Sequence, residues 1–542
     1  MKNIPYILCV LLMTSCIDTR KADLIVHNAV IYTADSVFNI RQAMAIRNGL
    51  IIETGTDDQI LTKYAASTMI DAKKQAVYPG FIDAHCHFLH YGLDMDDVEL
   101  TGTNSFKEVL HKVLVYASSH PDGWIVGRGW DQNDWKIKQL PDNHALDSLF
   151  PNRPVLLRRI DGHAALANSK ALEMAGITVS THIDGGIIGS RDGSLTGILL
   201  DNAADQLLGI IPPPSREKET RALLNAQKNC FSVGLTTVDD AGLDKDEVEL
   251  IDKLQKSGDL KIRIYAMLNP NDENINHYQK SGIYITDKLS VRAFKFYADG
   301  ALGSRGACLL QAYSDVADSV YYGFLLNSRQ YLSDMAFKMN EAGFQMNTHC
   351  IGDSANRMML NIYTGILKKG NNQRWRIEHC QVVDKEDIRK FGEYCILPSV
   401  QPTHATSDMP WAIDRLGADR IDNAYAYLSL LHQNNILPLG TDFPVEDINP
   451  VYTFYSAVFR KNKDGLPEKG YHIENALDRK QALLGMTRYA AYANFEEKMK
   501  GSLEAGKVAD FVILNRDIMN APEEEILKTR VIATYLSGEK VY

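Results

Sequence analysis

Little in this sequence indicates a nucleic-acid-binding or membrane-spanning protein. The formal net charge is −10, which argues against the basic surface that a phosphate backbone requires. The apolar run from Ile4 to Met13 is far shorter than the roughly 20 residues that a transmembrane helix needs. The eight cysteines include no CxxC pair, and a chain of 542 residues buries a core that needs no disulfide framework. We therefore expect a large globular protein with buried free thiols.

The first residues are typical of a secretory leader. Lys2 gives a positive start, the apolar run follows, and Thr14 and Ser15 stand directly before Cys16. Small residues before a cysteine resemble the cleavage box of a bacterial lipoprotein, in which the cysteine is lipidated. We predict a signal peptide over residues 1–16 and export to the bacterial periplasm or cell envelope, with a lipid anchor at Cys16. The alternative is an ordinary signal peptide in which this cysteine is incidental.

Short strand-like segments lie near both ends of the chain. Asn, Asp and Gly separate these alternating runs, as expected of strands joined by turns. The runs cover residues 22–33, 43–54, 69–78, 509–514 and 531–536. Because both ends share this texture, we predict one small β domain built from residues 22–78 and 500–542.

The middle of the chain, residues 79–499, alternates apolar strand-like runs with helical stretches. This alternation favours parallel βαβ units. Eight candidate strands lie at residues 77–85, 235–240, 262–268, 291–298, 344–349, 376–380, 396–401 and 437–442. Eight such units predict an α/β fold of the (β/α)8 TIM-barrel type, with a doubly wound open sheet as the alternative. The long interval after the first strand, at about residues 88–230, is interpreted as an insertion over the barrel mouth.

The strongest local motif is PGFIDAHCH at residues 79–87. Side chains at i and i+2 of a strand project from the same face, so His85 and His87 share one face. At the C-terminal end of a barrel strand both imidazoles would point into the mouth, where they can hold a divalent cation. The alternative is a pair of partly exposed polar residues at a strand end.

Lys295 lies within an apolar strand, on the face opposite Phe294 and Phe296. If those aromatic side chains meet the helices, Lys295 faces the barrel interior. A charged lysine is costly to bury unless it is paired or chemically altered. Carboxylation by carbon dioxide would convert it to an anionic carbamate able to bridge two metals. The simpler alternative is a lysine paired with Asp299 or Asp240.

Three further residues of ligand type end apolar strands: His349, His379 and Asp442. A satisfied core histidine would explain one such case. Three independent strands, together with His85, His87 and Lys295, make coincidence improbable. In a barrel all these strand ends converge on one face, which hosts the active site.

These motifs resemble the amidohydrolase superfamily, and within it the branch that includes N-substituted formamide deformylase-like enzymes. The similar stretches cover nearly all of the mature chain, in the family's order. They are PGFIDAHCH at 79–87, DGHAALANS at 161–169, KFYADGALGSR at 295–305, NTH at 347–349, IEH at 377–379, GTDFP at 440–444 and GKVADF at 506–511. The resemblance implies that the terminal β segments form a small β-sandwich beside the barrel.

The resemblance also implies a role for each strand-end residue. His85 and His87 would bind a first metal, and carboxylated Lys295 would bridge it to a second. His349 and His379 would hold the second metal. Asp442 would bind a metal and shuttle the proton. The implied cofactor is one or two divalent ions, with zinc as the expected metal.

The expected activity is hydrolysis of an amide-type carbon–nitrogen bond in a small molecule, by a metal-activated water. The substrate could be an N-formyl, N-acyl or cyclic amide. One alternative is a one-metal deaminase acting on a heterocycle, in which a bridging Lys295 would have no role. The other is a lipid-anchored binding protein without activity, which would not need the full ligand set.

Four further residues are candidates for substrate contacts. His163 and Trp130 lie in the insertion, while Arg305 and Gln401 follow strand ends. The competing interpretations are helix-start polarity for His163, a core aromatic for Trp130, and solvated loop residues for the other two.

Overall fold

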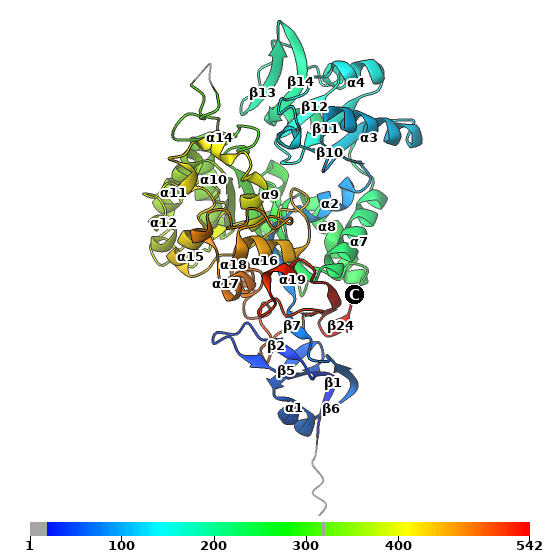
Figure 1. Cartoon of the computed structure of the whole chain (residues 1–542), viewed down its shortest axis with the longest axis vertical. Coiled ribbons are helices and arrows are strands. Elements are labelled where there is room, and N and C mark those ends of the chain that lie inside the picture. The colour runs from blue at the N-terminus through cyan, green and yellow to red at the C-terminus, as the bar shows by residue number, and fades with distance from the viewer. Residues whose placement is uncertain (1–18, 317–319) are drawn as a thin grey trace, which may run out of the picture.

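The protein is described here from a computed structural model that covers residues 19–316 and 320–542. Three units follow one another along the long axis of the molecule (Figure 1). A small β unit lies at one end, a barrel lies in the middle, and a separate inserted sheet lies at the other end. The leader and its cysteine at position 16 lie outside the described residues.

The barrel is built from parallel strands that pair in chain order around a ring. The strands are β8 (Phe81–Cys86), β15 (Leu235–Leu243), β16 (Arg263–Leu268), β18 (Leu289–Tyr297), β19 (Gln345–Cys350), β20 (Arg376–His379) and β21 (Leu397–Ser399). An extended segment at residues 437–442 takes the eighth place. It bridges β21 through the parallel pair Val400 and Leu439, and it meets β8 where Asp442 N donates to His85 O at 2.8 Å. The predicted TIM-barrel fold is thereby confirmed.

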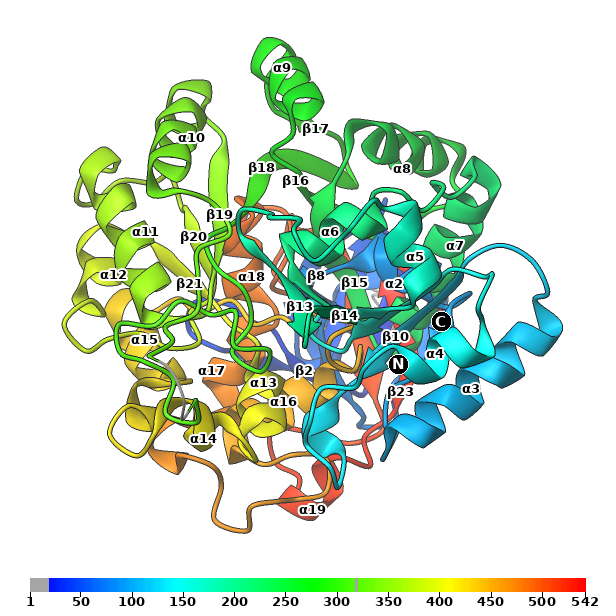
Figure 2. The same ribbon diagram turned by 90° about the horizontal axis from the view of Figure 1, so that it is seen from above.

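Helices surround the barrel, as Figure 2 shows in the view from above. They are α7 (Arg216–Ser232), α8 (Lys245–Ser257), α9 (Asp272–Ser281), α10 (Arg329–Ala342), α11 (Asp353–Ile366), α12 (Arg389–Glu393), α15 (Tyr427–Asn434), α16 (Pro450–Phe459), α17 (Arg479–Gly485) and α18 (Arg488–Ala493). Helix α8 is representative. A capping box between Asp244 and Glu247 begins it, and left-handed Gly258 ends it. Its buried Val248 and Ile251 belong to the main hydrophobic core.

Both termini contribute to the small β unit, as predicted. One sheet has the order β5-β4-β1-β6, and the other has the order β24-β23-β22-β7-β2-β3. The strands are β1 (Arg20–His27), β2 (Val30–Tyr32), β3 (Ile40–Arg41), β4 (Ala43–Arg47), β5 (Leu50–Gly55), β6 (Tyr64–Asp71), β7 (Ala76–Pro79), β22 (Phe511–Leu514), β23 (Val531–Leu536) and β24 (Glu539–Lys540). Apolar side chains from both sheets, including Met44, Val77 and Phe511, form one core between them. A buried ion pair between Asp510 and Arg263, with Nε and Oδ2 at 2.6 Å, ties this sandwich to the start of β16.

The chain between β8 and β15 forms a third sheet of its own, with the order β13-β14-β12-β11-β10-β9. Its elements are α2 (Phe88–Asp94), β9 (Val98–Glu99), α3 (Phe106–Ser119), β10 (Ile125–Trp130), α4 (His144–Leu149), β11 (Val155–Arg159), β12 (Ala164–Ala167), α5 (Ser169–Met174), β13 (Gly186–Arg191), β14 (Ser194–Asp201) and α6 (Asn202–Leu208). Two apolar clusters pack against the faces of this sheet. The unit stands at the end of the barrel opposite the sandwich (Figure 1).

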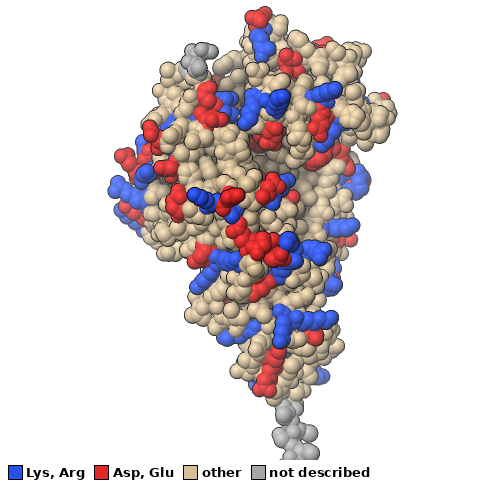
Figure 3. Space-filling view, in the orientation of Figure 1, with Lys and Arg blue, Asp and Glu red and all other residues tan. Residues whose placement is uncertain are grey.

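Acidic and basic side chains are interspersed over the face seen in Figure 3, without a broad patch of one sign. Among the described residues, no helix combines the length and the apolar character that a membrane crossing requires.

Candidate metal centre

The strand-end residues singled out from the sequence meet at one end of the barrel. His85 lies near the end of β8 with His87 just beyond it, Lys295 lies near the end of β18, and His349 lies near the end of β19. His379 ends β20, and Asp442 ends the eighth segment. Ligand atoms of His85, His379 and Asp442 all lie within 4.8 Å of one another, and all three residues are buried. Parallel strands bring these distant positions together because their C-terminal ends share one rim.

Two of these residues owe their position to an unusual backbone conformation. His379 has φ +71° and Asp442 has φ +63°, both in the left-handed region that residues other than glycine rarely adopt. In a regular strand, Glu378 and His379 would point to opposite faces. The left-handed turn at His379 instead lets both neighbours reach the metal centre. Such strain is found where a surrounding structure and a function maintain it.

Three imidazoles are oriented by hydrogen bonds to their Nδ1 atoms. Nδ1 of His85 lies 2.6 Å from Glu378 Oε2, Nδ1 of His87 lies 3.0 Å from Ala241 O, and Nδ1 of His379 lies 2.8 Å from Gln401 Oε1. Each acceptor takes the Nδ1 proton, so the lone pair of Nε2 is left for a ligand. This is the arrangement that metal-binding histidines adopt in proteins.

Lys295 is 1% exposed and forms no ion pair within the described residues. Its Nζ lies 3.2 Å from His85 Nε2 and 4.5 Å from the centroid of the Tyr297 ring. Neither carboxylate proposed as its partner is available: Asp299 accepts backbone N–H groups from Ile351 and Gly352, and Asp240 accepts those of residues 88 and 89. Burial lowers the pKa of Lys295 to about 8. The site therefore holds an unpaired amine that is partly neutral near neutral pH.

Asp442 lies between two imidazoles. Its Oδ1 is 3.4 Å from His87 Nε2, and its Oδ2 is 3.3 Å from His404 Nε2. Burial alone would raise the pKa of this carboxyl group, but the neighbouring imidazoles of His404 and His87 outweigh it and hold the pKa well below the usual value. Oδ1 is buried and has no hydrogen-bond partner. A fixed anion with an unsatisfied oxygen faces the imidazole nitrogens.

These observations fit a divalent metal. Three Nε2 lone pairs, an unpaired lysine and an unsatisfied carboxylate oxygen converge in a buried space, which is unfavourable without a bound cation. Histidine nitrogen and carboxylate oxygen are the donors that zinc accepts. His349 lies at the edge of this set, because its ring centroid is 4.5 Å from that of His379 while its Nε2 faces Gly300 O at 3.5 Å.

The four candidates for substrate contacts have different surroundings. His163 approaches the centre from the inserted sheet, with its ring centroid 5.0 Å from that of His349. Gln401 Oε1 accepts a hydrogen bond from His379 Nδ1. Arg305 pairs with Asp315, with Nη2 and Oδ2 at 2.7 Å. Trp130 is 1% exposed, and its Nε1 donates to Leu157 O at 2.8 Å, so it belongs to the core of the inserted sheet.

Sequence reasoning missed His404, Glu446 and Glu378. His404 links Asp442 to Glu446, with His404 Nδ1 3.0 Å from Glu446 Oε1. Burial lowers the pKa of His404, but its two carboxylate partners outweigh this and raise the pKa to about 10. Glu378 had one available signal: a glutamate beside a predicted ligand, within an otherwise apolar strand. For His404, in helix α13 (Pro402–Asp408), the sequence carried no such signal.

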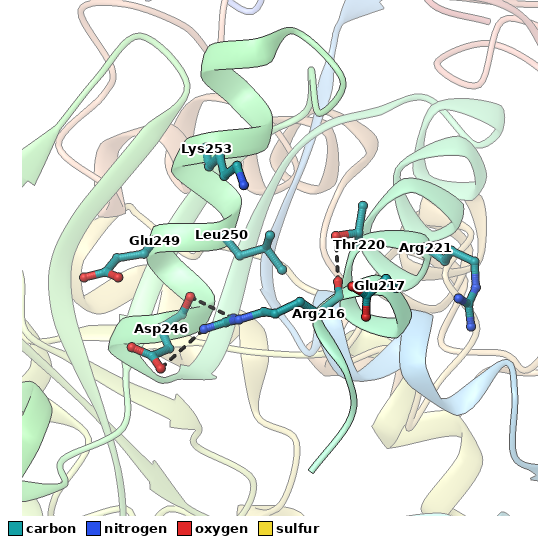
Figure 4. Close-up of a pocket in the computed structure, with 8 residues that line it drawn as sticks. All are labelled: Arg216, Glu217, Thr220, Arg221, Asp246, Glu249, Leu250 and Lys253. Carbon is teal, nitrogen blue, oxygen red and sulfur yellow. Dashed lines mark hydrogen bonds and ion pairs between the residues drawn. The ribbon is translucent and has the colours of Figure 1, made fainter.

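A separate groove lies on the outside of the barrel, between α7 and α8 (Figure 4). Arg216 crosses it toward Asp246, with Nη2 and Oδ2 at 3.3 Å, and its walls mix acidic and basic groups. None of the strand-end residues lines it. The groove is therefore distinct from the metal centre.

Comparison with known proteins gives consistent results. The sequence pattern of the amidohydrolase family matches residues 68–542. The chain is 32% identical to Protein LONG AFTER FAR-RED 3 of Arabidopsis thaliana, over 96% of this chain and 92% of that protein. It is 25% identical to N-substituted formamide deformylase of Arthrobacter pascens, over 96% of this chain and 98% of that enzyme. An uncharacterized metal-dependent hydrolase from Pyrococcus horikoshii superposes with a TM-score of 0.75 and 26% identity, over 92% of this chain and 99% of that one.

Proposed function

This chain belongs to the amidohydrolase family of metal-dependent hydrolases, and we propose that it cleaves the carbon–nitrogen bond of a small-molecule amide. The proposal covers N-formyl, N-acyl and cyclic amides. The observation that carries it is the buried Asp442, whose unsatisfied oxygen faces the histidine ligands. The similarity to an N-substituted formamide deformylase supports the same bond type.

The residues assigned to the metal are His85, His87, Lys295, His349, His379 and Asp442. One or two divalent ions would bind there, with zinc as the proposed metal and Lys295 as a carbamate. When bound, such an ion supplies a Lewis acid that polarises a carbonyl group and lowers the pKa of water. The unpaired, buried amine of Lys295 supports the carbamate, because carbon dioxide adds to a neutral amine.

Asp442 is assigned the proton transfers. As a carboxylate with a low pKa it is ionised at neutral pH, so it can accept a proton from the attacking water. The same group then passes the proton to the leaving nitrogen, because an amine leaves more readily than its anion. A hydrogen bond from His404 Nε2 holds Oδ2 of Asp442 in place during both transfers.

Lys295 also separates this proposal from a one-metal deaminase. A site with a single metal gives a bridging lysine no role, yet here the lysine is 1% exposed and points its amine at His85 Nε2. The amidase assignment gives that buried amine a function, because as a carbamate it would help to hold the metal ions.

The test is hydrolysis of p-nitroformanilide and p-nitroacetanilide by protein reconstituted with zinc, followed as release of p-nitroaniline. We expect turnover that chelation abolishes and added zinc restores. The variant His379→Asn should lose it, while His182→Asn, a change at a side chain that is 86% exposed, should not. Absence of turnover on these and on a cyclic amide such as dihydrouracil, with metal bound, would contradict the proposal.

A further inference from the structure

One imidazole reaches the metal centre from outside the barrel. His163 stands just before β12 of the inserted sheet, and its backbone O accepts a hydrogen bond from Asp201 N at 2.8 Å. Its side chain meets the same residue, with Nδ1 2.7 Å from Asp201 Oδ1. His163 and Asp201 are therefore joined by two hydrogen bonds at one end of the antiparallel pair of strands β12 and β14.

Among the described residues, the side chain of Asp201 forms no hydrogen bond other than the one with His163. Its carboxylate is fully buried, and Oδ2 has no partner among the described residues. Its backbone lies at φ +51° and ψ −123°, a region that favours glycine, so the fold accepts strain to place this side chain. An ordinary structural aspartate would use both oxygens and a relaxed backbone. The carboxylate is thus dedicated to His163.

The loop after β18 leaves room for this arrangement. A Cβ atom at Gly300 would lie 2.5 Å from Asp201 Oδ1, and one at Gly306 would lie 2.7 Å from Oδ2, so neither position accepts a side chain. Gly300 O also lies 3.5 Å from Nε2 of the metal-centre residue His349. The same glycine therefore lies against both the Asp201 carboxylate of the inserted sheet and His349 of the metal centre.

The imidazole of His163 has one nitrogen left for a bound molecule. Nδ1 is occupied by Asp201, while Nε2 has no hydrogen-bond partner among the described residues, and the side chain is 16% exposed. Its ring lies against His349, with centroids 5.0 Å apart. A molecule that reaches the metal ligands from the mouth passes next to this nitrogen.

We propose that His163, doubly protonated beside the Asp201 carboxylate, donates a hydrogen bond from Nε2 to the acyl oxygen of the substrate, and that Asp201 is the positioning residue that orients it. This inference rests on the proposed amide hydrolysis for the identity of the bound group. The barrel would supply the metal ligands and Asp442, which transfers the proton. The inserted sheet would complete the binding site by supplying His163. Substrates would be required to present a hydrogen-bonding acyl group at a fixed distance from the metals.

The experiment is a double-mutant cycle with His163→Asn, Asp201→Asn and both changes together, in zinc-loaded protein. We expect each single variant to lower kcat/KM for p-nitroformanilide roughly 10- to 100-fold, the range of a hydrogen bond to a charged group. If Asp201 acts only through His163, the double variant should be no worse than His163→Asn alone. A purely structural Asp201 would instead multiply the two losses, which would overturn its role.

Asp205→Asn is the matched control, since it removes a carboxylate one turn along α6 without touching the hydrogen bond to His163. Its kcat/KM should stay close to that of the wild type. Zinc content should equal that of the wild type in every variant, and loss of zinc from His163→Asn would overturn the inference. Should His163→Asn fail to fold, His163→Gln replaces it.

A second arm does not depend on hydrolysis. Acetohydroxamate, which carries an acyl oxygen and chelates zinc, is titrated calorimetrically into the same proteins. We expect its Kd to rise several-fold in both single variants and not in Asp205→Asn. If the wild type hydrolyses no amide but this pattern appears, the proposed function fails and the inference stands. Two outcomes would overturn the inference. In one, the wild type is active and the His163 and Asp201 variants keep its kcat/KM and Kd. In the other, the wild type does not bind acetohydroxamate.

Discussion

Glu378 Oε2 accepts a hydrogen bond from His85 Nδ1 at 2.6 Å in the closed interior of the barrel, where neither side chain is exposed. The other oxygen of Glu378 accepts from Arg376 Nε at 2.6 Å, and Arg376 Nη1 also binds Asp239 at 2.9 Å. Burial opposes the ionisation of Glu378, but Arg376 and His85 outweigh it and lower its pKa far below the usual value. A buried anion therefore fixes the tautomer of His85, the proposed metal ligand on β8.

Replacing Glu378 with Gln should weaken metal binding. The amide can present a donor to His85 Nδ1, so the tautomer with Nε2 available is no longer enforced. Loss of such a partner typically costs about 10- to 100-fold in metal affinity. Zinc retained after dialysis against a graded chelator series measures the change. Glu393→Gln, an exposed carboxylate paired with Lys369, is the control, and equal zinc affinity in the two variants would disprove the role of Glu378.

Asp442→Asn should separate proton transfer from folding. The amide keeps the shape of the side chain and can offer an oxygen to a metal, but it accepts no proton at neutral pH. We expect turnover to fall by about 10,000-fold, the upper range for a general acid–base group, with most of the zinc retained. Stopped assays with elemental analysis measure both. A variant that keeps a tenth of wild-type turnover would show that the proton travels by another route.

Metal uptake by the apoprotein should require carbon dioxide, because Lys295 is proposed to bind metal as a carbamate. Burial lowers its pKa to about 8, so the protonated amine that cannot react prevails below that pH, and the neutral nucleophile prevails above it. At a fixed concentration of dissolved carbon dioxide, metal uptake by the apoprotein should accelerate as the pH rises through about 8. Lys295→Ala should take up little metal at any pH. Uptake that is independent of carbon dioxide in the wild type would rule out the carbamate.

We propose that Cys16 carries the lipid that holds the exported protein at the cell envelope, and that the membrane is contacted only through this anchor. The substitution Cys16→Ser should release the protein from the membrane fraction of a bacterial host, because one residue carries the acyl chains. Immunoblots of soluble and membrane fractions measure the release. Mass spectrometry of a mature N-terminus downstream of residue 16, without lipid, would reject the anchor.

The sequence alone determined the architecture and predicted which residues meet at the rim of the barrel. Alternating apolar runs predict parallel strands, and parallel strands of a barrel end on one rim, so a ligand-type residue at each strand end predicts a shared site. His85 and His87 follow from the two-residue period of a strand, and so does the inward position of Lys295 between two outward phenylalanines. The strands and the direction of these side chains could be inferred because both depend on local periodicity.

Tertiary structure alone decided what surrounds those residues. In a regular strand, Glu378 and His379 would point to opposite faces, so Glu378 would point away from the metal centre. Only the left-handed turn at His379 brings both side chains inward. His404 comes from a helix and Asp201 from the inserted sheet. No sequence period relates them to their partners, Asp442 and His163. Their positions depend on how separate units pack: Gly300 and Gly306 admit the Asp201 carboxylate only because they lack side chains. Local pattern therefore identifies the residues that meet at the rim, while long-range packing decides how they are oriented.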